Sequence, residues 1–121
     1  MVFSDFDRLV DYIVEQRIKK VMCAKSAEYS RGDDKLWNFK RAAEIDGITP
    51  EQALRGMDLK HRTNISDMLD TLNTIDTETA TINSKPVEYS REIWEEKLTD
   101  HINYMFLLYA LLAERYGWKI E

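Results

Sequence analysis

Apolar residues recur at intervals of three and four positions along four stretches of the chain, a spacing that places side chains on one face of an α-helix. The first stretch runs from Ser4 to about Ala27, and the second from Lys35 to Glu44. The third starts at Thr49 and continues for about twenty residues, and the fourth runs from Ser90 to Gly117. Almost no segment alternates as a half-buried strand does. The pattern predicts an all-α fold of three long helices and one short helix.

Residues that begin and end helices stand at the edges of these stretches. Thr49, Pro50 and Gln52 have the spacing of a capping box, with threonine as N-cap and proline at the first helical position. Ser90 is a second candidate N-cap, and Gly47 can take the left-handed conformation that follows a helix. These local signals predict where the second helix ends and where the third and fourth begin.

Residues 73–88, between the third and fourth helices, are rich in threonine, hold a single proline and lack a helical period. Such a segment predicts a flexible loop. Because 121 residues suit one domain, we expect residues 1–121 to form a single helical domain. Amphipathic helices of this length pack as an antiparallel bundle, and in a small chain they leave apolar faces uncovered. We therefore expect dimerisation or higher oligomerisation to complete the bundle.

Charge is distributed unevenly along the chain. The net charge is −5, yet residues 17–41 contain eight Lys or Arg against three acids, a local charge of +5. An acidic chain binds duplex nucleic acid poorly, because that affinity depends on neutralising phosphates. A basic stretch facing an acidic remainder suits a small anion, with a cation bridging the two. The expected partner is a phosphorylated small ligand and not duplex nucleic acid.

The sequence does not indicate a membrane or disulfide protein. The longest purely apolar run, residues 105–113, is far shorter than the ~20 residues of a membrane span. The N-terminus lacks the pattern of a secretory signal, and the single cysteine, Cys23, cannot form an internal disulfide. We expect a cytoplasmic protein without a membrane partner, in which Cys23 is buried and inert.

The fourth helix contains the main candidate for a metal site. Glu96, Asp100 and Asn103 are spaced by four and three residues, so they share one helix face. Carboxylate and carboxamide oxygens suit Mg²⁺, and Asp67 on the third helix could complete the set. Since motifs for nucleophilic catalysis are absent, chemistry here would be metal-assisted, with water as the attacking group. The alternative is that these acids simply form the solvated start of a helix.

Other residues are candidates for contact with the ligand itself. Lysines can neutralise phosphates, and aromatic side chains near cations can stack on a base. Core packing explains the aromatic residues equally well, and Asp58 with Arg62 has the spacing of an ordinary surface ion pair on a helix. His61 could be a packed histidine, and a structural role is favoured for His101. The candidate ligand-binding residues are Lys25, Tyr29, Trp37, Asn38, Lys60, His61, Asn103 and Tyr104.

Four segments together form a recognisable pattern: Asn38–Ala43, Ile48–Leu54, Gly56–His61 and Trp94–Tyr104. They resemble a family of small proteins encoded by bacteriophages and prophages, whose functions are mostly unknown. The similarity covers most of residues 25–113. It implies that the protein works in the cytoplasm of a host cell.

A lysine followed by a tyrosine four residues later, and the late Asp100-x-x-Asn103-Tyr104, are similar to a wider phage set linked to nucleotide modification. That set is similar in turn to the MazG-like all-α nucleoside triphosphate pyrophosphohydrolases, which use Mg²⁺. The resemblance implies nucleotide binding, with Mg²⁺-dependent pyrophosphohydrolysis as the corresponding activity. Glu96 and Asp100 are spaced by four residues and not by the three of the metal-binding motifs in those enzymes, and nothing else marks Glu92 and Glu95, which do have that spacing. The alternatives are therefore a non-catalytic nucleotide sponge and a protein-binding inhibitor that counters host defence. A helical adaptor that binds a protein through an apolar face is the third hypothesis.

Overall fold

The computed structural model describes residues 1–22, 31–32, 34–73 and 88–120. Its regular elements are helices, which confirms the all-α class for this part of the chain. Residues 74–87 of the expected loop lie outside the described residues, as do Cys23, Lys25 and Tyr29. The elements are α1 (Phe3–Tyr12), the π-helical η1 (Ile13–Lys19), α3 (Trp37–Asp46), α4 (Pro50–Asn73) and α5 (Arg91–Tyr116).

The helix boundaries follow the local signals closely. The backbone N–H of Thr49 donates to Oε1 of Gln52 at 3.0 Å, and the N–H of Gln52 donates to Oγ1 of Thr49 at 3.1 Å. This reciprocal pair is a capping box, as predicted. Ser90 caps α5 by accepting from the backbone N–H of Ile93. α1 starts at Phe3, one residue before the predicted start, and its N-cap residue makes no side-chain hydrogen bond.

Glycine ends two of the helices. Gly47 follows α3 with φ +67°, and Gly117 follows α5 with φ +64°. Both angles lie in the left-handed region, which glycine adopts without the steric penalty of a Cβ atom. The predicted stop at Gly47 is therefore confirmed, and the same local chemistry ends the last helix.

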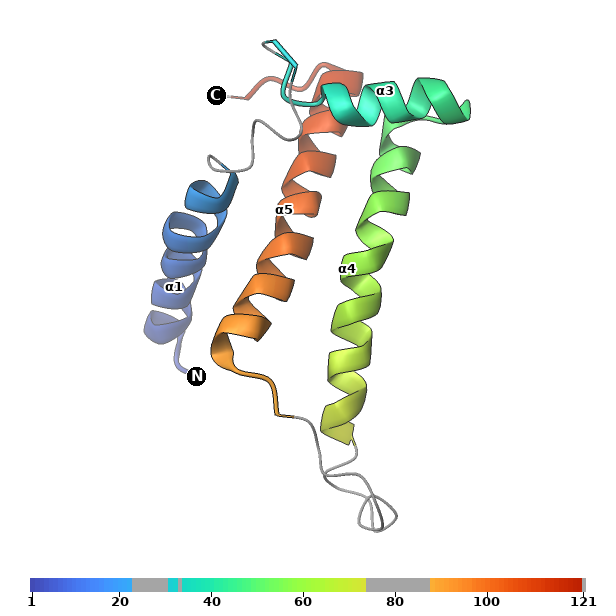
Figure 1. Ribbon diagram of the computed structural model, residues 1–121. Coiled ribbons are helices and arrows are strands. Elements are labelled where there is room, and N and C mark those ends of the chain that lie inside the picture. Colours follow the sequence, from blue (N-terminus) through green and yellow to red (C-terminus); the bar gives the residue numbers. More distant parts are fainter. Residues whose placement is uncertain (23–30, 33, 74–87, 121) are drawn as a thin grey trace.

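Helix α5 lies between the N-terminal helix and α4 (Figure 1). α4 and α5 run antiparallel to each other, and α3 crosses one end of this pair. Contacts join η1 to α5, α4 to α5, and α3 to α4. α5 therefore meets a neighbour on more than one side, although Met105, Phe106 and Tyr109 in its apolar C-terminal half remain exposed. None of the described helices is long and apolar enough to cross a membrane.

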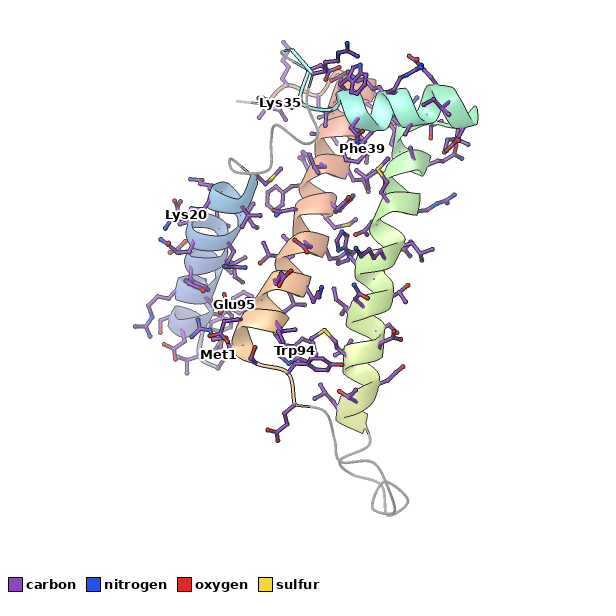
Figure 2. All side chains as sticks on the ribbon, viewed as in Figure 1. Met1, Lys20, Lys35, Phe39, Trp94 and Glu95 are labelled. Atoms are coloured by element: carbon purple, nitrogen blue, oxygen red, sulfur yellow. The ribbon has the colours of Figure 1, made fainter. Side chains whose placement is uncertain are left out.

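The core lies where α3 meets α4 and α5. Phe39 is 0% exposed, and Figure 2 shows it on the side of α3 that faces the other two helices. Partly buried side chains of Met22, Met57, Tyr104 and Leu108 pack against the cluster. Its buried members are Leu36, Phe39, Leu54, Leu107 and Leu111. The main apolar core is thus at the end of the molecule where α3 lies. Polar contacts between side chains must contribute to holding the other parts of the helices together.

Polar contacts tie the N-terminal helix to α5. The Tyr12 hydroxyl donates to Glu95 at 2.6 Å, and Nε of Arg17 donates to Oγ1 of Thr99 at 3.2 Å. The hydrogen bond from Tyr12, followed by that from Arg91, lowers the pKa of Glu95. The carboxylate of Glu95 therefore accepts hydrogen bonds from both Tyr12 and Arg91 where the N-terminal helix meets α5.

Charged pairs also hold the end of the molecule at α3. Nζ of Lys40 lies 2.8 Å from Asp34 and 2.6 Å from Glu114, so it joins the start of α3 to α5. Its hydrogen bond with Asp34 is the main cause of both a raised pKa of Lys40 and a lowered pKa of Asp34. Glu51 accepts from Arg115 through both carboxylate oxygens, at 2.6 and 2.7 Å, which joins α4 to α5.

Replacing Glu51 by glutamine is expected to lower the melting temperature at pH 7, and the difference from wild type should shrink in acid. The hydrogen bonds from Arg115 hold the pKa of Glu51 below its ordinary value. A carboxyl whose pKa is lowered by folding stabilises the folded state above the unfolded-state pKa, and this contribution disappears as pH falls through the folded-state pKa. Melting scans of both proteins between pH 7 and pH 3 measure the effect.

Glu44→Gln is the matched control, because Glu44 is exposed and pairs with Arg41 on the same helix. Its melting temperature should stay close to wild type at every pH. A constant difference between Glu51→Gln and wild type across this range would contradict the role given to the Arg115 contact.

Candidate functional site

The expected metal ligands do not come together in the structure. Glu96 and Asp67 are exposed, whereas Asp100 is largely buried and its Oδ2 lies 3.8 Å from Nδ1 of His61. Within the described ranges, no three or more His, Cys, Asp or Glu side chains are grouped so that they could hold a metal ion. In this part of the chain the three expected acids therefore do not form one group, and Mg²⁺ binding remains a prediction. Helical spacing aligns side chains on one helix but does not bring a second helix's ligands to meet them.

Some of the expected ligand-binding residues do meet. The rings of His61 on α4 and Tyr104 on α5 have centroids 5.0 Å apart, beside the Asp100 carboxylate. Tyr104 also contacts Phe39 edge-to-face at 6.2 Å, so the tyrosine belongs partly to the core. Asn103 is buried, and its Oδ1 has no hydrogen-bond partner among the residues that the structure describes.

Other expected residues lie apart from this cluster. Lys60 is exposed on α4. Trp37 stands at the start of α3, where the Arg31 guanidinium lies 5.1 Å from its ring centroid, and Asn38 follows it in a half-buried position. The described members of the predicted set are thus not gathered into one site, whereas a neighbouring group of residues on α4 and α5 lines a pocket.

Among the described residues, the most deeply buried charged side chain is that of Asp58 on α4, whose residue is 1% exposed. Its two oxygens lie 3.0 and 2.9 Å from Nδ1 of His101 on α5. Since a carboxylate can only accept, Nδ1 carries the hydrogen of this contact, and Asp58 does not engage Nε2. A buried acid that orients a partly exposed histidine is a common arrangement at functional sites.

Two histidine–aspartate contacts therefore connect α4 with α5 in opposite senses. Asp58 and His61 lie three residues apart on α4, while Asp100 and His101 are consecutive on α5. In one contact the acid comes from α4, and in the other it comes from α5. The reciprocal pairs fix the register of the two helices at this height, and the Asp58–His101 pair borders an open pocket.

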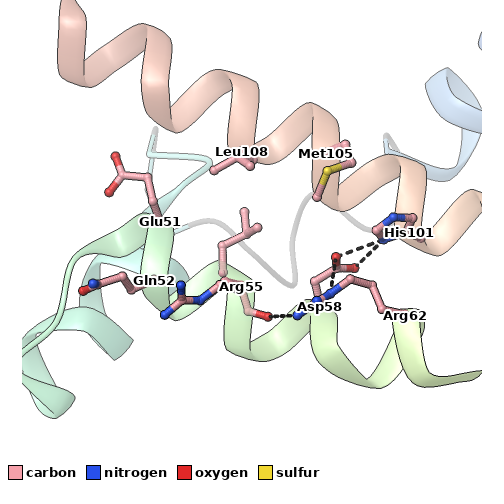
Figure 3. Close-up of a pocket in the computed structure, with 9 residues that line it drawn as sticks. Glu51, Gln52, Arg55, Asp58, Arg62, His101, Met105 and Leu108 are labelled. Carbon is pink, nitrogen blue, oxygen red and sulfur yellow. Dashed lines mark hydrogen bonds and ion pairs between the residues drawn. The ribbon is translucent and has the colours of Figure 1, made fainter.

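This pocket is a groove between α4 and α5 with a volume of about 500 Å³ (Figure 3). Leu54, Leu108 and Met105 form its apolar lining, and Asp58 with His101 closes one end. The remaining lining residues are Glu51, Gln52, Arg55 and Arg62. The groove combines an apolar surface with polar and charged groups, as small-ligand sites do.

Two guanidinium groups supply positive charge to the groove. Nη2 of Arg62 donates to the backbone oxygen of Arg55 at 3.3 Å, and Nε of Arg62 lies 3.6 Å from Oδ2 of Asp58. Arg62 is therefore held in place by its own helix. Toward the described residues, the guanidinium of Arg55 makes no ion pair, which leaves it available to an anion.

Spacing within single helices did not identify this groove. The sequence did contain a signal for these two buried polar residues. Asp58 follows Leu54 by four residues, and His101 lies on the same helix face as the apolar residues Leu98 and Met105. A polar side chain within an apolar stripe indicates a buried group that needs a partner. Asp58 and His101 lie on different helices and are 43 residues apart, so no local sequence pattern could identify them as partners.

Comparison of the chain with family models, curated proteins and solved structures finds no match.

Proposed function

We propose that the groove between α4 and α5 binds a nucleotide or a similar phosphorylated ligand. The observation that carries this proposal is the presence of Arg55 and Arg62 beside an apolar floor in one groove of about 500 Å³. Guanidinium groups bind phosphate oxygens through paired hydrogen bonds. The apolar floor suits the face of a base, and pockets for small ligands span roughly 300–1,000 Å³.

His101 supplies a further polar contact to the proposed ligand. Its Nδ1 is engaged by Asp58, so Nε2 is the atom with free hydrogen-bonding capacity. Orientation by a buried acid lowers the entropy that the imidazole loses when a ligand binds. In this proposal Asp58 is a positioning residue, whereas Arg55, Arg62 and His101 touch the ligand.

A thermal-shift screen tests the binding directly. The probes are ribonucleoside and deoxyribonucleoside mono-, di- and triphosphates, each with and without Mg²⁺. A ligand at a hundred times its dissociation constant adds ~2.7 kcal/mol to the free energy of unfolding, which corresponds to a rise in Tm of about 10 °C. For the nucleotide that gives a shift, the double variant Arg55→Gln/Arg62→Gln should weaken binding at least ten-fold.

Arg8→Gln is the matched control, since Arg8 is exposed on α1 and pairs with Asp5 on the same helix. Its affinity should equal that of wild type. If no nucleotide raises the Tm, or if the double variant binds as tightly as wild type, the groove is not a nucleotide site.

Hydrolysis is a second candidate function, which the Asp58–His101 contact favours. Water would attack the α-phosphorus of a bound triphosphate and pass its proton to Nε2 of His101, while the bond to pyrophosphate breaks and pyrophosphate leaves with the electron pair. Pyrophosphate release by wild type and its loss in His101→Gln would support this candidate. Recovery of intact nucleotide after binding would instead favour a sponge that sequesters a nucleotide signal, a role suited to a phage protein acting against host defence.

A further inference from the structure

Helix α1 presents an apolar stripe to solvent. Phe6, Leu9 and Val10 are three and four residues apart, so they lie on one face of the helix, and Val2 extends this face at the N-cap. More than a third of each of these residues is exposed, and Phe6 is 53% exposed. No residue of α1 is buried. A contiguous exposed apolar surface on a folded protein marks an interaction site.

A different side of the N-terminal helix contacts α5. The Tyr12 hydroxyl donates to Glu95, and Arg17 in η1 donates to Thr99. Residues two positions apart on a helix point in nearly opposite directions, so Tyr12 and Val10 lie on different sides. α1 also lies at one edge of the molecule (Figure 1). The contact with α5 therefore leaves the stripe open to another molecule.

Acidic side chains border the stripe on both edges. Asp7 lies three residues before Val10, and Asp11 follows Asp7 by one turn, so both acids lie along one edge. Both are exposed, and neither makes an ion pair with the residues that the structure describes. Asp5 borders the other edge, where Arg8 neutralises it. Two unpaired like charges one turn apart destabilise a helix, so α1 is stabilised by a partner that neutralises them.

These charges decide which partner fits the stripe. A second copy of α1 would bring Asp7 and Asp11 against the same acids, and like charges across an interface oppose binding. Helices that lie on membranes carry Lys and Arg on their polar face, whereas acids dominate that face of α1. An amphipathic helix with basic residues beside its apolar face has the complementary charge.

We propose that α1 binds a basic amphipathic helix of another protein. The apolar face of the partner covers Phe6, Leu9 and Val10, and two Lys or Arg residues one turn apart pair with Asp7 and Asp11. Apolar contact supplies the stabilisation, and the flanking ion pairs fix the orientation and select the partner. Binding at α1 is tested without any nucleotide, so its outcome is independent of the ligand proposed for the groove between α4 and α5.

The probe is a fluorescent synthetic peptide of two heptads with leucine at the a and d positions and lysine elsewhere. The control peptide has the same leucines and glutamate in place of lysine. Fluorescence anisotropy with the full chain should show at least about ten-fold tighter binding of the lysine peptide, and this preference should shrink as salt is raised from about 0.05 to about 0.5 M. Equal affinity for the two peptides, or no binding of either, would overturn the proposal.

Variants in the stripe test its apolar part. Phe6→Ser should weaken binding of the lysine peptide at least about ten-fold, because truncating a central aromatic residue removes much of the binding energy. Phe106→Ser is the matched control, since Phe106 is 47% exposed and lies on α5. Its affinity for the peptide should equal that of wild type. Equal weakening by both substitutions would mean that the peptide does not bind α1.

Variants of the acids test the charge complementarity. Asp7→Asn/Asp11→Asn should abolish the preference for the lysine peptide over the glutamate peptide. Asp67→Asn/Asp70→Asn makes the same change in charge on α4, where both acids are exposed, and should keep the preference. A preference that survives in the α1 double variant, or that is lost in both, contradicts the ion pairs proposed here.

The other occupants of the stripe give different results. Sedimentation velocity of the full chain alone would reveal a dimer that Phe6→Ser dissociates, if a second copy covered the stripe. Co-sedimentation with phosphatidylglycerol vesicles, lost in Phe6→Ser, would assign the stripe to a lipid surface. Either result would overturn the proposal, whereas wild type that neither dimerises through Phe6 nor binds the vesicles supports it.

Discussion

Replacing Phe39 by alanine is expected to lower the free energy of unfolding by about 3–5 kcal/mol. The side chain is fully buried among Leu36, Leu54, Leu107 and Leu111, at the junction of three helices. Its removal costs the transfer free energy of the ring and leaves a cavity that the crossing of α3 over α4 and α5 cannot close. Because folded domains are stable by only about 5–15 kcal/mol, this loss is a large part of the total.

Urea denaturation followed by circular dichroism, at one fixed protein concentration, measures this change. Phe3→Ala is the matched control, since Phe3 is 90% exposed and makes the same change in side-chain volume. Its effect should stay within about 0.5 kcal/mol of wild type. Similar losses in both variants would show that the junction of α3 with α4 and α5 is not the core of the fold.

Replacing Asp58 by alanine is expected to cost about 2–3 kcal/mol of stability. The change leaves Nδ1 of His101 without its acceptor and the Arg62 guanidinium without this ion-pair partner, and it removes the contact that connects α4 to α5 at the groove. Breaking a fully buried ion pair costs about 3–5 kcal/mol. The loss of stability expected for Asp58→Ala is smaller, because His101 and Arg62 both reach solvent and can be hydrated once the Asp58 carboxylate is removed.

A double-mutant cycle separates the contact from other effects of the substitution. Asp58→Ala, His101→Ala and the double variant should give a coupling free energy within about 0.5–3 kcal/mol. Glu96→Ala is the control, because Glu96 is an exposed acid on the neighbouring helix, and its change should stay below about 0.5 kcal/mol. Additive losses from Asp58 and His101 would mean that their contact does not hold the helices together.

The helices were predictable because their signals are local. The capping box of Thr49 and Gln52, the cap at Ser90 and the stop at Gly47 act within one turn of backbone, so neighbouring residues are sufficient to identify them. The apolar period likewise identified the helical stretches that became α3, α4 and α5. The expected oligomer remains a prediction.

The candidate site was not predictable in the same way. Glu96, Asp100 and Asp67 had suitable chemistry and spacing, yet the crossing of α4 and α5 turned Asp100 toward His61 and left the other two acids in solvent. Which residues meet depends on the rotation and height of one helix against another, and these are set by the packing of many side chains at once.

The chain's local pattern was therefore enough to define an all-α protein, the starts of its helices and the apolar stripes that must be buried. Tertiary packing decided that Asp58 meets His101, which is 43 positions further along the chain, that Arg55 and Arg62 border one groove, and that the end of α5 keeps its aromatic side chains exposed. The difference is physical: helix formation is governed by neighbours in sequence, whereas a site between helices exists only after distant side chains have packed together.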